Sequence, residues 1–156
     1  IDTSNYMVEL AKQRFKHLIE QKIVQIKNMD LREDFPPVNA SVILSILTIQ
    51  FTPIEYRQNI IQNVYNHLID GGAFIFVEKV LGSTNDINKT MVNNYYEMKS
   101  NNGYSYEDID RKKSSLEGVL VPVTAKWNEE LVKMSGFRQV DCFWRWMNFS
   151  GWIAIK

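Results

Sequence analysis

The stretch VILSILTI at residues 42–49 is almost wholly apolar and rich in branched side chains. A second stretch of the same character, AFIFVEKV, spans residues 73–80. Continuous apolar runs of this length are typical of strands buried on both faces of a parallel sheet. Between them we expect a helix, ended by Asp-Gly-Gly at 70–72, whose buried stripe is formed by Ile60, Ile61, Val64 and Leu68. This order predicts an α/β fold with a Rossmann-like, mostly parallel sheet that helices cover on both faces.

The segment before the first apolar run continues the alternation. Ser4 is a suitable N-cap for an amphipathic helix that reaches about Gln21. Residues 23–26 (IVQI) are expected to form a short strand. The Pro-Pro pair at 36–37 predicts a loop, and Pro53 suits the first turn of the helix after the central strand.

The sequence changes character after residue 83. We expect a helical insert over about 84–122, followed by a helix over 124–135. Residues 137–146 and 149–155 predict an antiparallel hairpin at one edge of the sheet. No linker or repeat interrupts the chain, so we expect one domain over residues 1–156.

Composition excludes several classes of protein. The 156 residues suit one domain, and 18 basic against 18 acidic side chains give no net charge to attract nucleic acid or a membrane surface. No apolar run approaches the roughly 18 residues that span a bilayer. The single cysteine, Cys142, excludes an intrachain disulfide framework and fits a reducing, cytoplasmic location.

Polar side chains at the expected strand ends are the best candidates for ligand binding, because open α/β sheets bind ligands there. Asp2 can accept hydrogen bonds from ribose hydroxyls, or it can help to cap the next helix. Asp30 can accept from an adenine amino group while Leu31 packs on the ring. Ser45 and Ile46 lie close to where a cofactor would rest, although their chemistry alone favours ordinary strand core.

The remaining reactive side chains form no catalytic constellation. His17 and His67 are expected on solvated helix faces, and nothing resembles a metal site. The basic triplet at 111–113 indicates a solvated surface or a contact with an anionic group. Four tyrosines fit a pocket lining or core packing equally well, namely Tyr95, Tyr96, Tyr104 and Tyr106.

Several short motifs resemble a known fold. The motifs Ile-Asp at 1–2, Asn-Met-Asp at 28–30, ILTIQF at 46–51, GGA at 71–73 and VEK at 77–79 resemble the class I S-adenosylmethionine-dependent methyltransferase fold. Three further stretches are similar to the carboxy-S-adenosylmethionine synthase family, namely KSNNGYS at 99–105, KKSSLEGV at 112–119 and MNF at 147–149. This resemblance covers essentially the whole chain.

The resemblance implies a homodimeric cytosolic enzyme that binds S-adenosylmethionine. Such an enzyme uses prephenate to form carboxy-S-adenosylmethionine, releases phenylpyruvate, and supplies a partner enzyme that modifies the wobble uridine of tRNA. By the match, Asp2 and Thr3 hold the ribose, and Asp30 and Leu31 hold the adenine. No catalytic residue and no metal ligand is assigned.

Two positions depart from the family pattern. Ile46, on the cofactor side of the central strand, aligns with a family asparagine. Lys113 aligns with an arginine that grips a carboxylate, so the charge remains but the planar fork is lost.

The fold's first strand and glycine-rich loop are expected to be absent from the chain, since its seven glycines include no Gly-x-Gly. Two alternatives to the synthase therefore stay open. One is a conventional S-adenosylmethionine-dependent methyltransferase that acts on a small molecule or tRNA. The other is a non-catalytic interaction surface.

Overall fold

The computed structural model describes all 156 residues, and they form two compact units, Ile1–Pro37 and Val38–Lys156. The first unit contains α1 (Asn5–Arg14) and the short α2 (Lys16–Glu20), which meet at Phe15. Ser4 is the N-cap of α1, as predicted, and its Oγ accepts from the Met7 N–H at 3.4 Å.

The predicted strand over 23–26 is wrong. Lys22 has a φ of 59°, and the N–H groups of Ile23 and Val24 both donate to the Leu18 carbonyl. Because this turn uses the first two donors of the segment, strand pairing does not begin there. The pairing in this unit is one isolated parallel bridge between Asp2 and Asn28.

The second unit is built on a five-stranded sheet of mixed direction. Its strands are β1 (Ala40–Ile46), β2 (Leu68–Leu81), β3 (Val123–Thr124), β4 (Gln139–Trp146) and β5 (Phe149–Ile155). The order is β1-β2-β5-β4, with β3 paired to the end of β2. β1 runs parallel to β2, whereas β5 runs antiparallel to both β2 and β4. The predicted α/β fold and the edge hairpin are confirmed.

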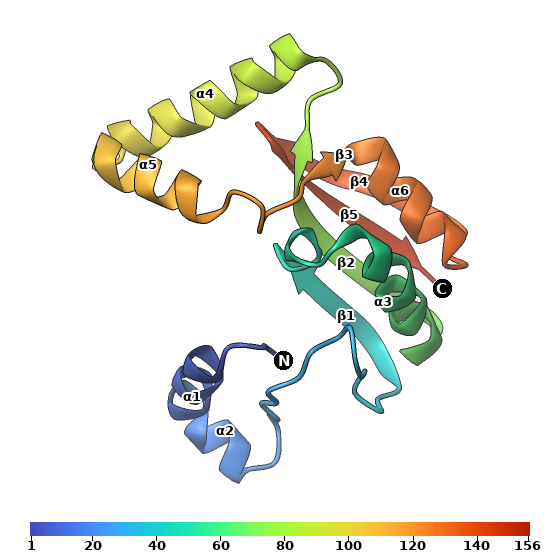
Figure 1. Cartoon of the computed structure of the whole chain (residues 1–156). Helices are drawn as coiled ribbons and strands as arrows, with labels where there is room; N and C mark the ends of the chain where they lie inside the picture. Colours follow the sequence, from blue (N-terminus) through green and yellow to red (C-terminus); the bar gives the residue numbers. More distant parts are fainter. The chain divides into compact units, whose positions relative to one another are not determined.

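The helices of this unit occupy two places (Figure 1). α3 (Ile54–His67) and α6 (Ala125–Met134) pack against each other and on one face of the sheet, which we call the helix face. α4 (Asn85–Asn101) and α5 (Tyr106–Ser115) form a side-by-side pair, as the helical insert predicts. A short 3-10 helix, η1 (Ile49–Phe51), follows β1.

The boundary between α3 and β2 differs from the prediction. The helix ends at His67, and Leu68 already belongs to β2. Asp-Gly-Gly at 70–72 therefore lies inside a long strand, where Gly71 has a φ of 77°. The sequence pattern resembles a helix C-cap, but the left-handed glycine here bends a strand.

The core lies on the helix face. Phe76 stacks between Phe74 and Trp152, with ring centroids 4.9 and 4.8 Å away, and all three rings are buried. Helix side chains complete this core, namely Ile60, Ile61 and Val64 from α3 and Leu131 and Val132 from α6.

The opposite face of β1 corrects the expectation of burial on both faces. Val42, Leu44 and Ile46 are 50, 64 and 53% exposed. Both α3 and α6 pack on the helix face, and β1 has β2 as its one neighbour in this unit. The apolar side chains that point the other way consequently find no cover within the unit.

Candidate functional site

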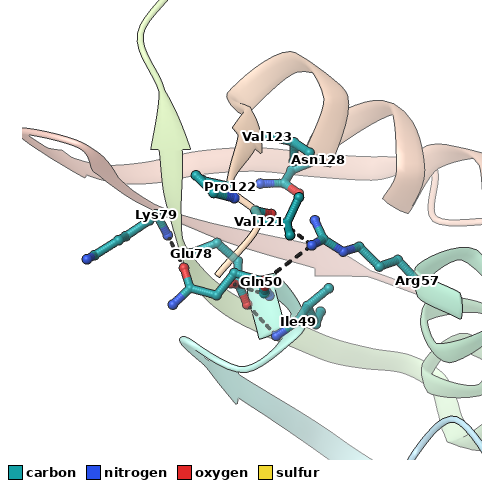
Figure 2. Close-up of a pocket in the computed structure, with 9 residues that line it drawn as sticks. All are labelled: Ile49, Gln50, Arg57, Glu78, Lys79, Val121, Pro122, Val123 and Asn128. Atoms are coloured by element: carbon teal, nitrogen blue, oxygen red, sulfur yellow. Dashed lines mark hydrogen bonds between the residues drawn. The ribbon is translucent and has the colours of Figure 1, made fainter. Parts of the chain in front are cut away.

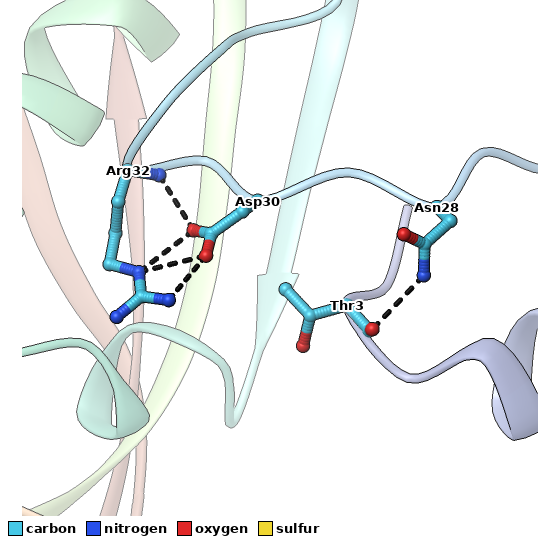
Figure 3. A network of polar contacts seen from close by, with 4 residues as sticks. All are labelled: Thr3, Asn28, Asp30 and Arg32. Carbon is cyan, nitrogen blue, oxygen red and sulfur yellow. Dashed lines mark hydrogen bonds and ion pairs between the residues drawn. The ribbon is translucent and has the colours of Figure 1, made fainter.

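The first unit holds Asp2 and Thr3 against the segment that ends at Asp30. The Asp2 N–H donates to the Lys27 carbonyl at 3.2 Å, and the Asp2 carbonyl accepts from Met29 at 3.1 Å. The Asn28 side-chain amide donates to the Thr3 carbonyl at 3.0 Å (Figure 3). These bonds fix two short, non-adjacent stretches of chain side by side.

The Asp30 carboxylate is paired with Arg32, a contact that the sequence analysis missed. Oδ1 accepts from the Arg32 backbone N–H and from Nε, both at 2.9 Å, and the guanidinium also forms an ion pair with Oδ2 (Figure 3). The side-chain and backbone hydrogen bonds from Arg32 lower the pKa of Asp30 to about 2. The spacing Asp-x-Arg at 30–32 is the signal that could have revealed it.

The polar atoms of this unit fit a nucleoside. Asp2 Oδ1 accepts from the Ser4 N–H at 2.8 Å, as the capping interpretation expected, while Oδ2 has no hydrogen-bond partner. The Thr3 hydroxyl is exposed and makes no hydrogen bond within the chain. A carboxylate oxygen and a hydroxyl in adjacent residues suit the two hydroxyls of a ribose.

In the second unit, Ile46 stands at the end of β1. Its carbonyl accepts from the Thr48 hydroxyl at 3.2 Å, and Leu47 has a φ of 55° with its N–H bonded to the Val77 carbonyl at 2.7 Å. The residues predicted to bind the cofactor thus divide between the units, with Ile46 in the second.

Glu78 is a buried carboxylate that the sequence analysis did not single out (Figure 2). Its side chain is 2% exposed and receives three backbone N–H groups. Oε1 accepts from Thr48 at 3.3 Å and Ile49 at 3.0 Å, and Oε2 accepts from Gln50 at 3.0 Å. The carboxylate therefore fixes the turn that leads from β1 into η1.

Arg57 ties the same turn to the chain before β3. Its guanidinium, in a residue 1% exposed, donates to the carbonyls of Thr52 at 2.8 Å, Gln50 at 3.2 Å and Val121 at 2.8 Å (Figure 2). Burial raises the pKa of Glu78 to about 7, although the three N–H donors and Arg57 act in the opposite direction. A glutamate inside the apolar run 73–80 was the available signal for this network.

A small pocket adjoins these two charged groups. It is lined by Ile49, Gln50, Arg57, Glu78, Lys79, Val121, Pro122, Val123 and Asn128 (Figure 2). Within it the buried amide nitrogen of Asn128 has no hydrogen-bond partner. The pocket lies near the end of β2. Its charged groups, Glu78 and Arg57, therefore position the segment that follows β1 at the carboxyl end of the sheet.

Lys113 lies in the last turn of α5 and is exposed. It takes part in no ion pair. The structure therefore leaves its ammonium group available to an external anion.

Comparison with known proteins shows which family the chain resembles. Residues 1–76 match the family model described as a methyltransferase domain. The chain is 41% identical, over all 156 residues, to a carboxy-S-adenosyl-L-methionine synthase of Staphylococcus epidermidis. The chain is similar to this family and to this synthase. A synthase of the same name from Methylococcus capsulatus is 36% identical over the same length.

The chain spans 66% and 64% of the lengths of those two relatives. The resemblance to the synthase family that the insert motifs indicated is confirmed by these relatives.

Solved structures confirm the predicted fold of the chain. The S-adenosylmethionine-dependent methyltransferase SibL matches with a TM-score of 0.66 at 11% identity, covering 100% of this chain and 42% of that one. Human N-acetylserotonin methyltransferase matches with a TM-score of 0.61 at 15% identity, covering 99% and 39%. None of the helices in the structure has both the length and the hydropathy needed to cross a membrane.

Proposed function

We propose that this protein binds S-adenosylmethionine and converts it, with prephenate as the carboxyl donor, into carboxy-S-adenosylmethionine. The observation that carries the proposal is the 41% identity over the whole chain with a relative named for that product. The methyltransferase fold supports the choice of cofactor.

The residues of the first unit supply the nucleoside contacts. Asp2 Oδ2 accepts a hydrogen bond from one ribose hydroxyl, and the Thr3 hydroxyl forms a hydrogen bond with the other. Leu31 packs against the adenine. Asp30 accepts from the adenine amino group in addition to the Arg32 donors, of which Nε is shared between both carboxylate oxygens. Ile46 offers an apolar contact at the end of β1. The cofactor supplies a reactive sulfonium methyl group, so the contribution of the chain is positioning and charge compensation.

The carboxylate that is transferred to the cofactor is assigned to Lys113. Beyond the chain itself, we propose a homodimer in the cytoplasm whose product serves a tRNA-modifying enzyme, and we keep residues 1–156 as a single functional domain. These assignments rest on the synthase resemblance.

The decisive experiment is mass spectrometry of the nucleosides released after incubation with S-adenosylmethionine and prephenate. A carboxylated cofactor together with phenylpyruvate is the expected result. Unmodified cofactor with no prephenate-dependent turnover contradicts the synthase and favours a conventional methyltransferase. One observation favours the conventional methyltransferase: Lys113 and Ile46 stand where the synthase family has an arginine and an asparagine.

Asp30→Asn is expected to weaken S-adenosylmethionine binding roughly tenfold, because an amide replaces a charged acceptor of the adenine amino group. Isothermal titration calorimetry measures the change. Glu33→Gln, at an exposed neighbour in the same loop, is the matched control and should bind as the unaltered chain does. Equal affinities for both variants would remove Asp30 from the adenine contact.

Lys113→Ala is expected to weaken binding of carboxy-S-adenosylmethionine by roughly tenfold and to leave S-adenosylmethionine nearly unaffected, because one charge-assisted contact is lost. Competition calorimetry with the two cofactors gives the ratio. Lys133→Ala on α6 is the control, since that exposed lysine also has no ion-pair partner. An equal loss for both cofactors would mean that Lys113 does not contact the added carboxylate.

A further inference from the structure

Lysine and aromatic side chains gather where α4 crosses the end of β2. Lys79 Nζ lies 5.2 Å from the ring centroid of Tyr95 and 5.5 Å from that of Phe149. Lys99 Nζ lies 5.4 Å from the same Tyr95 ring and 5.1 Å from the Tyr104 ring. We call these five residues the lysine–tyrosine cluster. All of them belong to the second unit.

The cluster holds positive charge without a carboxylate. Neither Lys79 nor Lys99 takes part in any of the five ion pairs of the chain. Lys112, from α5, adds a third unpaired ammonium group that acts on Lys79, whereas Arg111 beside it is paired with Asp108. Burial, followed by the charges of Lys99 and Lys112, lowers the pKa of Lys79. Like charges held together in this way are unfavourable until an anion neutralises them.

The aromatic rings give the cluster rigid walls. Tyr95 packs edge-on against Phe149, with centroids 5.3 Å apart, and against Trp146 at 6.4 Å. The Lys79 side chain is directed away from the Glu78 network (Figure 2). The Lys79 ammonium group therefore lies away from that network, near the carboxyl end of β2, which is where α/β sheets bind ligands.

We propose that the lysine–tyrosine cluster, with Lys112, binds a small organic acid that carries two carboxylates on an apolar body. Two or more ammonium groups match two carboxylates, and the tyrosine and phenylalanine rings match the apolar part. The chain as a whole has no net charge, and the three lysines of this site lie in one small area. The site therefore suits a small dianion better than a polynucleotide, which needs an extended basic surface. The inference rests on the proposed function, since it assigns the site of the second substrate there.

The test is calorimetric titration of the protein with phenylsuccinate, a dianion with an apolar ring, and with the monoanion 3-phenylpropionate. We expect phenylsuccinate to bind roughly tenfold more tightly, and its affinity to fall as salt is added. Lys99→Met should lower that affinity by roughly tenfold or more, while keeping the aliphatic stem against the rings. Lys79→Met should act in the same direction. Lys126→Met on α6 is the matched control, because Lys126 already has a partner in Glu130.

Three results would overturn the inference. The first is that Lys99→Met, with an unaltered circular dichroism spectrum, binds phenylsuccinate as tightly as the unaltered chain does. The second is equal affinity for phenylsuccinate and 3-phenylpropionate. The third is that a tRNA stem-loop binds in a lysine-dependent way and phenylsuccinate does not bind. Titration with S-adenosylmethionine in parallel separates the two proposals. Lysine-dependent phenylsuccinate binding without cofactor binding supports the cluster and contradicts the proposed function. Cofactor binding without phenylsuccinate binding contradicts the cluster alone.

Discussion

Replacing Arg57 with methionine is expected to lower the free energy of unfolding by about 3–5 kcal/mol. The guanidinium is buried and donates to three backbone carbonyls that belong to η1, to the start of α3 and to the chain before β3. Methionine fills much of the same volume but donates nothing. The part-buried carbonyls of Thr52 and Val121 then lose their side-chain donor, and Glu78 loses its compensating charge.

Urea denaturation followed by circular dichroism measures this loss. Arg138→Met, at an exposed arginine without an ion pair, is the matched control and should change stability by no more than about 0.5 kcal/mol. Arg57→Lys should fall between the two, because lysine keeps the charge but cannot reach carbonyls in several directions. If Arg57→Met were as stable as the control, the guanidinium would not hold the segments together.

The second large effect is a dependence of stability on pH that originates at Glu78. The carboxyl group of the folded chain has a pKa of about 7, whereas its ordinary value is 4.5. Between these values the folded chain binds more protons than the unfolded chain, so the free energy of unfolding decreases as pH rises through this window. A shift of this size corresponds to about 3 kcal/mol between acidic and alkaline conditions.

Subtracting a Glu78→Gln variant isolates this group. The amide nitrogen of glutamine would face the Gln50 N–H, and that cost does not vary with pH. The unfolding free energy of the unaltered chain minus that of Glu78→Gln should therefore decrease from pH 5 to above pH 8. Glu55→Gln, at an exposed glutamate in the first turn of α3, should give a difference that does not change with pH. A Glu78 difference that is flat or increases with pH would show that the three N–H donors outweigh burial.

Sequence patterns predicted the main elements because their signals are local. The run 73–80 is a buried strand, Ser4 caps its helix, and the hairpin of β4 and β5 pairs as expected. The short strand at 23–26 was wrong because a turn at Lys22 gives its donors to Leu18. Apolar composition alone cannot show which donors the preceding helix end will use.

The candidate site was less predictable than the fold. Asp30 came from its place at an expected strand end and from the family resemblance, and the role of Lys113 came from the resemblance. Glu78 lay within one of the quoted motifs, but nothing in the sequence paired it with Arg57. The partners of Glu78 and Arg57 are mostly backbone groups of residues distant in sequence, including Val121. Since every residue type carries the same backbone donors and acceptors, the sequence contains no sign of such partners.

The outward side of β1 has a consequence for the behaviour of the protein in solution. Its exposed apolar row, Val42, Leu44 and Ile46, borders a strand edge that is unpaired within the unit. A strand that combines an open hydrogen-bonding edge with apolar, branched side chains is a template for adding strands from other molecules. The run that directs the chain into an α/β fold thus also presents an edge that favours aggregation, and a charged residue on its exposed row is expected to suppress aggregation without touching the core.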